Sequence, residues 1–145
     1  MNCALLEAEK AFSLEEVPVG AVIVDSFSGE IIAATHNEMV GRKDPTAHAE
    51  LLALQQACTV KGIGRLEECD LYVTLEPCPM CAQAISFSRI RRLYFGAYDP
   101  KGGGVDHGAK IFNASSCHHR PEVMGGLEEE KCSTLLKKFF EIRRI

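Results

Sequence analysis

The chain has 145 residues, of which 46% are hydrophobic and 25% charged. That is typical of one soluble globular domain, so we expect a single domain over residues 1–145. It contains no run of eighteen apolar residues and no secretory signal at its N-terminus, so we expect no membrane span and a cytoplasmic location. The net charge of −4 gives no general support to nucleic-acid binding, for which a basic domain is the usual sign, although a local basic patch stays open.

Amphipathic repeats, β-branched runs and turn residues predict an alternation of strands and helices. In chain order we expect a helix over 3–14, strands over 17–24 and 31–35 joined by a turn, a helix from 44 toward 62, a strand over 70–75, a helix over 78–88, a strand over 92–96, a flexible glycine loop at 102–104, a short strand over 122–124 and a closing helix over 127–144. Asp44-Pro45-Thr46 indicates a helix start, because Asp is a capping residue and Pro suits an early helical position. The alternation predicts an α/β three-layer sandwich, in which a central mixed sheet of about five strands is flanked by helices.

The seven cysteines are an odd number in a chain without a recognisable export signal. This favours metal ligands or free thiols over a disulfide framework. The sequence Thr-Ala-His-Ala-Glu contains His48 and Glu50, and Glu-Pro-Cys-Pro-Met-Cys places Cys78 and Cys81 within reach of one metal ion. Tetrahedral Zn²⁺ takes imidazole and thiolate ligands, and three protein ligands leave a fourth position open for water, whose pKa the metal lowers.

Both segments lie at expected helix starts that follow strands, where the helix dipole favours a thiolate and where α/β folds build their sites. The alternative is that the Cys-x-x-Cys pair is a redox pair or half of a structural zinc site. A structural site needs a fourth protein ligand; the candidates are His36, Cys58, Cys69, His107, Cys117, His118 and His119. The combination of His-x-Glu with Pro-Cys-x-x-Cys is more specific than either half and matches the signature of zinc nucleobase deaminases.

At these motifs the chain resembles the cytidine/deoxycytidylate deaminase superfamily. From about residue 8 to residue 144 it is most similar to the bacterial branch that converts the wobble adenosine of tRNA to inosine. The stretches that carry this closer likeness are 16–22, 41–50, 71–78, 88–90, 95–97, 139–140 and 143–144. The resemblance implies that His48, Cys78 and Cys81 bind Zn²⁺. It also implies that zinc-bound hydroxide attacks C6 of adenine, with Glu50 as the catalytic proton shuttle.

The same resemblance implies the substrate contacts and the partners. Asn37 would read the purine, Val19 would form an apolar wall of the base pocket, and Asp99 would lie in the loop beside the bound nucleotide. The family is homodimeric and its tRNA site draws on both subunits, so we expect a second copy of the chain and a tRNA anticodon loop as partners. The basic residues expected to contact RNA phosphates are Lys101, Lys110, Arg120, Arg143 and Arg144.

Other interpretations stay open. Without the resemblance, Asn37 and Asp99 would be interpreted as turn residues and Val19 as a core residue. The chain could instead deaminate a free base or nucleoside, such as guanine or cytosine, which needs every zinc residue but no RNA surface. It could also be a non-catalytic zinc-binding module, although a structural zinc site has no need of Glu50. The apolar residues Met80, Ala84, Ile85 and Phe87 exceed what one sheet face needs and favour a homodimer.

Overall fold

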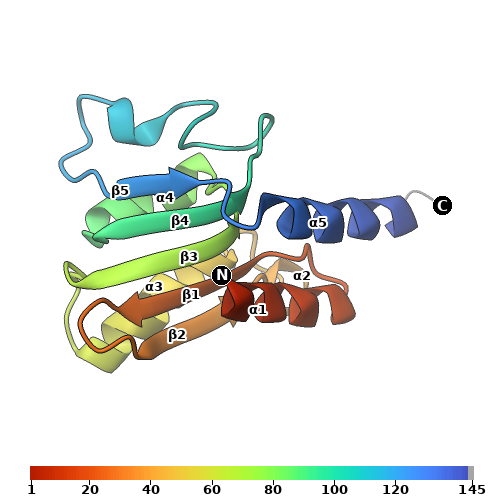
Figure 1. Cartoon of the computed structure of the whole chain (residues 1–145), viewed down its shortest axis with the longest axis horizontal. Helices are drawn as coiled ribbons and strands as arrows, with labels where there is room; N and C mark the ends of the chain where they lie inside the picture. The colour runs from red at the N-terminus through yellow and green to blue at the C-terminus, as the bar shows by residue number, and fades with distance from the viewer. Residues whose placement is uncertain (144–145) are drawn as a thin grey trace.

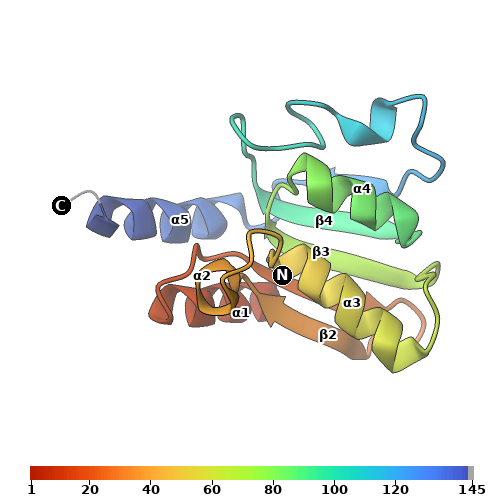
Figure 2. The same ribbon diagram turned by 180° about the vertical axis from the view of Figure 1, so that it is seen from behind.

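The computed structural model describes residues 1–143, which form a five-stranded sheet with helices on both of its faces (Figures 1 and 2). The helices and strands in chain order are α1 (Asn2–Ser13), β1 (Gly20–Asp25), β2 (Ile31–His36), α2 (Met39–Arg42), α3 (Ala49–Lys61), β3 (Cys69–Leu75), α4 (Pro79–Phe87), β4 (Arg92–Ala97), the short 3₁₀ helix η1 (Ile111–Asn113), β5 (Glu122–Gly125) and α5 (Glu129–Arg143). No helix in this range is long and apolar enough to cross a lipid bilayer.

The strand order in the sheet is β2-β1-β3-β4-β5. β1 runs antiparallel to both β2 and β3, whereas β3, β4 and β5 are mutually parallel neighbours. The expected mixed sheet is therefore confirmed. Because of these directions, the start of β1 and the ends of β2, β3 and β4 all meet at one edge of the sheet.

Helices α1 and α5 cover one face of the sheet, and α3 and α4 cover the other, which confirms the three-layer sandwich (Figures 1 and 2). Gly20 allows α1 to lie directly on β1, because a Cβ atom there would lie only 2.0 Å from the carbonyl oxygen of Ala4. The aromatic rings of Phe12 and Phe139 meet edge to face at 5.8 Å between centroids and join α1 to α5. Helices α1 and α5 therefore pack against each other as well as against the sheet.

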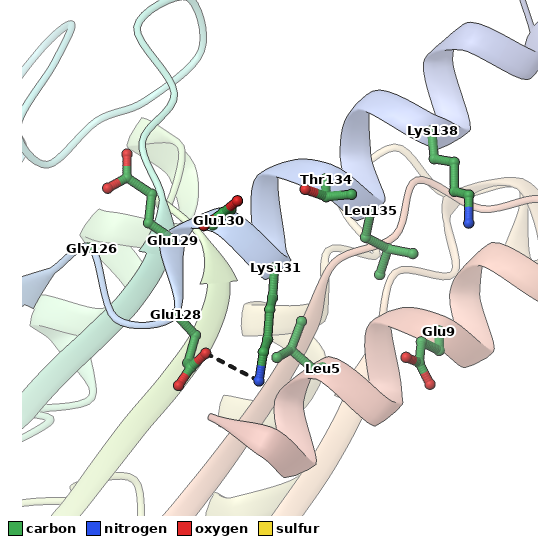
Figure 3. A pocket seen from close by; sticks show the side chains of 10 residues that line it. All are labelled: Leu5, Glu9, Gly126, Glu128, Glu129, Glu130, Lys131, Thr134, Leu135 and Lys138. Carbon is green, nitrogen blue, oxygen red and sulfur yellow. Dashed lines mark ion pairs between the residues drawn. The ribbon is translucent and has the colours of Figure 1, made fainter.

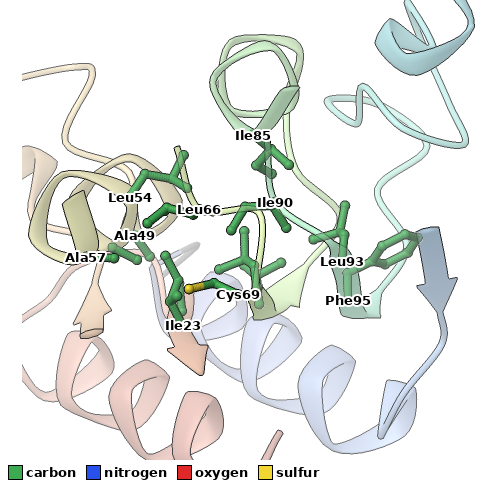
Figure 4. Packing of buried hydrophobic residues seen from close by; sticks show 14 of the residues in the cluster. Ile23, Ala49, Leu54, Ala57, Leu66, Cys69, Ile85, Ile90, Leu93 and Phe95 are labelled. Atoms are coloured by element: carbon green, nitrogen blue, oxygen red, sulfur yellow. The ribbon is translucent and has the colours of Figure 1, made fainter. Parts of the chain in front are cut away.

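The main core lies between the sheet and the α3–α4 layer (Figure 4). Ile23, Leu71, Leu93 and Phe95 contribute to it from three adjacent strands, and each is fully buried. Ile85 enters the same core from α4. This continuous apolar contact fixes α3 and α4 next to each other on the sheet, and with them the positions of their first turns.

Two expected element starts are wrong. The helix expected from residue 44 begins at Ala49, because the Oδ1 atom of Asp44 accepts hydrogen bonds from the backbone N–H and the hydroxyl of Thr46, at 2.8 and 2.6 Å, and so closes a separate turn. The strand expected from residue 17 begins at Gly20, because the N–H of Val19 bonds back to the carbonyl oxygen of Val17 in a tight turn. Helices α2 and η1 have too few residues to give a periodic signal and were not expected.

A hollow of about 780 Å³ lies between α1 and α5 (Figure 3). Leu5 and Leu135 form its apolar wall, and Lys131 pairs with Glu128 at 3.4 Å at its rim. None of the residues singled out by the zinc motifs lines it. The hollow is therefore a feature of helix packing and not the site to which the motifs point.

Candidate metal centre and active site

The candidate metal ligands lie at the starts of two neighbouring helices. His48 is the N-cap residue of α3 and Cys78 is the N-cap residue of α4, both with extended backbone conformations. Cys81 lies in the first turn of α4. Pro79 begins α4 directly after Cys78, where its fixed φ angle suits the first helical position. Because α3 and α4 pack side by side, these two helix starts bring the three side chains together.

The spacing of the three side chains fits a tetrahedral zinc site. The Nδ1 atom of His48 lies 3.6 Å from the sulfur of Cys78 and 3.6 Å from that of Cys81. A zinc ion with a Zn–S bond of about 2.3 Å and a Zn–N bond of about 2.05 Å, at the tetrahedral angle, places sulfur and nitrogen about 3.6 Å apart. The three ligand atoms all lie within 4.8 Å of one another. The ligand types and the distances both fit Zn²⁺ as the cofactor.

The charge state of this cluster is already biased toward metal binding. The hydrogen bond from the Cys81 thiol, together with His48, lowers the pKa of Cys78 to about 4 against the effect of burial. The hydrogen bond with Cys78 also raises the pKa of His48. The pKa of Cys81 is raised, because its thiol donates to the neighbouring thiolate and is buried. A metal ion would displace that shared proton, since both sulfurs bind as thiolates.

A fourth protein ligand is not found. Among residues 1–143, the group of His, Cys, Asp and Glu side chains close enough to share a metal ion consists of His48, Cys78 and Cys81 alone. Two of the histidines considered as fourth ligands bond elsewhere: the ring of His107 contacts Glu76 at 2.8 Å, and that of His119 contacts the carbonyl oxygen of Ile90 at 2.7 Å. Three ligands and an open position are the pattern of a catalytic zinc site.

Glu50 lies in the first turn of α3, two residues beyond His48, and is 4% exposed. Burial raises the pKa of its carboxyl group to about 7, with a further contribution from the negative charge of Cys78. The carboxyl group does not belong to the ligand cluster. A buried carboxyl group with a pKa near neutrality, beside a metal site that it does not ligate, has the properties required of a proton shuttle.

Asn37 and Val19 are joined to the metal centre through the backbone. The Oδ1 atom of Asn37 accepts a hydrogen bond of 2.8 Å from the N–H of Ala49, the residue between His48 and Glu50. The N–H of Asn37 in turn donates to the carbonyl oxygen of Val19 at 3.1 Å. No hydrogen bond from the side-chain NH₂ group of Asn37 is found among residues 1–143, so this group can donate to a ligand. Val19 is 4% exposed and belongs to the core cluster, as its alternative interpretation expected.

Asp99 follows β4 at the same edge of the sheet, and its N–H donates to the Oε1 atom of Glu76 at 3.0 Å. Glu76 was not singled out from the sequence. Its carboxyl group is fully buried; burial acts to raise its pKa, but hydrogen bonds from Asp99 and His107 hold the pKa below its usual value. The signal that was available is the position of Glu76 itself, at the end of a buried strand and two residues before Cys78.

Most of the basic residues expected to contact RNA are exposed. Lys101, Lys110 and Arg120 all lie on the connection between β4 and β5. Arg143 is also exposed, but its guanidinium donates to the carbonyl oxygen of Glu15 at 2.6 Å and lies 4.3 Å above the ring of Phe139. It therefore stabilises the contact of α5 with the end of α1. Arg144 lies outside the described residues.

The apolar surface of α4 is smaller than the sequence suggested. Ile85 is fully buried in the chain's own core and cannot serve a second subunit. Met80 and Phe87 are 36% and 73% exposed, with Ala84 on the same face between them. The expectation of excess apolar surface therefore holds for this face of α4 and is wrong for Ile85.

A family model described as the cytidine and deoxycytidylate deaminase zinc-binding region matches residues 1–97 of this chain. That range contains His48, Cys78 and Cys81, the three side chains whose atoms form the cluster. The chain belongs to this family of zinc-dependent deaminases.

Within the family the chain is similar to tRNA-specific adenosine deaminases. It is 50% identical over 145 residues to the tRNA-specific adenosine deaminase of Agrobacterium fabrum, covering all of this chain and 94% of that protein. A solved structure from a study of A-to-I editing by tRNA:A34 deaminases at the wobble position superposes with a TM-score of 0.90 at 51% identity, covering 94% of this chain and 97% of that one. A guanine deaminase from Bacillus subtilis is 30% identical with a TM-score of 0.65, covering 99% and 91%.

Proposed function

We propose that this protein deaminates adenosine to inosine at the wobble position of a tRNA anticodon loop. The observation that carries the proposal is the three-ligand cluster of His48, Cys78 and Cys81 with the buried Glu50 beside it. The substrate assignment is supported by the 50% identity to a tRNA-specific adenosine deaminase over the whole chain. The alternative function, deamination of a free base or nucleoside, has the weaker support of a 30% identical guanine deaminase.

The reaction needs an activated water molecule and a group that transfers protons. When bound, zinc supplies a water molecule with a pKa lowered toward neutrality, which is a nucleophile at physiological pH. Glu50 would accept one proton from the attacking water and deliver it to N1 of adenine, and would then move the proton of the new C6 hydroxyl group to the departing amino group. The oxygen of the water forms the new bond to C6 and the C6–N6 bond breaks, so that adenosine and water become inosine and ammonia.

Two further residues orient the base. The free NH₂ group of Asn37 would donate to an acceptor on the purine, and its oxygen bond to Ala49 keeps that donor fixed relative to Glu50. Val19 would supply an apolar contact beside it. Anticodon bases are unpaired and can be splayed into such a site without opening a duplex. Asp99, on the loop that follows β4, would lie beside the bound nucleotide.

Deamination of a free base, guanine or cytosine, is the second candidate. The observation that favours it is the net charge of −4, since an RNA-binding surface is usually basic. The exposed Lys101, Lys110 and Arg120 on one connection of the chain are the counter-observation, because exposed basic side chains can contact phosphates even on an acidic protein.

A side-by-side assay of an anticodon stem-loop, free adenosine, guanine and cytosine at moderate salt tests the proposal. We expect inosine from the stem-loop and little or no product from the free compounds, because remote binding energy from flanking nucleotides raises the rate at the reacting carbon. Efficient turnover of guanine or cytosine with an untouched stem-loop would refute the tRNA assignment and leave the zinc chemistry intact.

We also propose that the protein is a homodimer, formed through the exposed face of α4 that carries Met80 and Phe87. An aromatic side chain that is 73% exposed on a surface helix is the type of residue that anchors an interface. Light scattering of wild type and Phe87→Asp is the test: we expect a dimer mass and a monomer mass, respectively. A concentration-independent monomer mass for wild type would contradict the dimer.

We further propose that residues 1–145 form a single domain and that the protein is located in the cytoplasm, where tRNA is found.

A further inference from the structure

The carboxylate of Glu76 is a buried acceptor surrounded by hydrogen-bond donors from one loop. Its Oε1 atom accepts from the N–H of Asp99 at 3.0 Å and from the ring Nδ1 of His107 at 2.8 Å. Its Oε2 atom accepts from three successive backbone N–H groups, those of Val105, Asp106 and His107, at 2.9–3.2 Å. One side chain therefore fixes both ends of the segment 99–107.

The same segment packs against the first turn of α4. The N–H of Gly104 donates to the carbonyl oxygen of Pro77 at 2.8 Å. A Cβ atom on Gly104 would lie 2.5 Å from the backbone nitrogen of Pro79, and one on Gly103 would lie 2.4 Å from the Oε2 atom of Glu76. Both glycines are buried, so they serve close approach to neighbouring atoms within the loop that the sequence predicted.

The connection between β4 and β5 rises beyond the edge of the sheet and carries η1 (Figure 1). Between Asp99 and His107 it contains no helix or strand, so its backbone donors need acceptors from elsewhere. Glu76 supplies them from a position two residues before the zinc ligand Cys78. A shift of the carboxylate would therefore move the loop relative to the metal centre.

We propose that Glu76 is a positioning residue, whose buried carboxylate holds the 99–107 segment against the start of α4 and so sets the place of Asp99 and Lys101 for the bound RNA. The proposal rests on the proposed function for its substrate. It concerns binding geometry and leaves the chemistry to Glu50 and the zinc ligands. The anchored segment itself, without any substrate, is a property that can be measured separately.

Glu76→Gln separates the two ends of the anchor. An amide has one acceptor oxygen and one NH₂ group, and the three N–H donors of residues 105–107 will hold the oxygen. The NH₂ group then faces the N–H of Asp99, where two donors meet, and the ring of His107, which can accept by changing its tautomer. The variant is therefore expected to lose the Asp99 contact and to keep the contacts of Val105 and Asp106.

The experiment combines steady-state kinetics on an anticodon stem-loop with zinc analysis and amide hydrogen exchange. For Glu76→Gln we expect KM to rise about tenfold or more, since a hydrogen bond to a charged group is lost, with a smaller change in kcat and full zinc content. The amide of Asp99 should exchange faster than in wild type, while those of Val105 and Asp106 stay protected. Asp70→Asn is the matched control, because Asp70 is a buried carboxylate at the other end of β3 that pairs with Arg91 at 2.7 and 2.9 Å.

A wild-type KM in Glu76→Gln would overturn the proposal, as would a loss of kcat and zinc at unchanged KM, which would place Glu76 in the metal centre. An equal rise of KM in Asp70→Asn would also overturn it. If Glu76→Gln does not fold, His107→Ala removes one contact at a half-exposed side chain and should raise KM in the same direction by a smaller factor; an unchanged KM overturns the proposal. If wild type leaves the stem-loop untouched, the proposed function fails, and the exchange pattern alone then supports or overturns the anchor.

Discussion

Substitution of Gly104 by alanine should disturb the metal centre from outside it. A Cβ atom at this position would lie 2.5 Å from the backbone nitrogen of Pro79, 2.7 Å from its Cα and 2.8 Å from the carbonyl carbon of Cys78. All three are backbone atoms, so none can rotate away as the end of a side chain would. Non-bonded contacts to carbon are comfortable at about 3.5 Å, so the loop or the start of α4 must move by roughly 0.7–1 Å.

This movement should lower both the free energy of unfolding and the enzymatic activity. Forcing one extra carbon into a packed interior costs typically about 1–3 kcal/mol of unfolding free energy. Cys78, one of the two residues that the new atom meets, is a candidate zinc ligand, and a misplacement of about 1 Å near reacting groups can lower the rate on the order of 10²-fold. We therefore expect Gly104→Ala to unfold at lower urea concentration and to retain about 1% of wild-type turnover on the stem-loop.

The matched control is Gly64→Ala, where the new Cβ atom meets nothing within 4 Å. Urea unfolding followed by circular dichroism, zinc analysis and initial rates on the stem-loop would be measured for both variants and wild type. We expect the control to match wild type in turnover. Wild-type stability and turnover in Gly104→Ala would refute the argument, because they would mean that the loop does not lie against Cys78 and Pro79.

Three other predictions concern the proton shuttle, the metal and the RNA contacts. Glu50→Gln should keep its zinc and its fold but lose about 10²–10⁴-fold in turnover, and a variant that keeps a large share of the rate would exclude Glu50 as the shuttle. Cys78→Ala should lose zinc by metal analysis, and chelation should inactivate wild type until zinc is returned; full zinc occupancy in the variant would contradict the ligand assignment. The affinity for the stem-loop should fall with salt, with a slope of log affinity against log salt of about 0.7 for each phosphate contacted. Lys101→Ala should reduce that slope, and an unchanged slope would remove Lys101 from the RNA contacts.

The cluster of His48, Cys78 and Cys81 could be predicted from the sequence because the identity and spacing of these residues are sufficient. Cys78 and Cys81 lie at the start and in the first turn of one helix, so their three-residue spacing alone brings their sulfurs together. His48 could be added because the strand–helix alternation places both helix starts at the same sheet edge. The helix start itself was placed five residues too early, since Asp44 and Pro45 suit a turn as well as a helix. That error left the ligands intact because His48 remains next to the start of α3.

The roles of two buried glutamates, Glu76 and Glu16, in holding neighbouring segments could not be predicted. Their hydrogen-bond partners are distant in sequence and are mostly backbone N–H groups, which every residue type except proline has. Glu76 bonds to N–H groups 23 to 31 positions away. Glu16, which is 4% exposed, accepts hydrogen bonds from the N–H groups of Val40 and Gly41 at 3.0 and 2.7 Å. It thereby holds α2, which is part of the segment between Asn37 and His48.

Glu76 and Glu16 meet the same physical requirement. A segment beside an active site that forms no regular ladder leaves backbone donors without partners, and a buried donor without an acceptor costs about 1–3 kcal/mol. One carboxylate offers two oxygens with several acceptor positions, so a single buried glutamate can satisfy several donors and hold an irregular loop in one conformation. The energetic cost of burying the charge is offset only when donors surround it, as they do at Glu76. The position of Glu76 at the end of a buried strand is therefore visible in the sequence, whereas the donors that surround its carboxylate become known only from the structure.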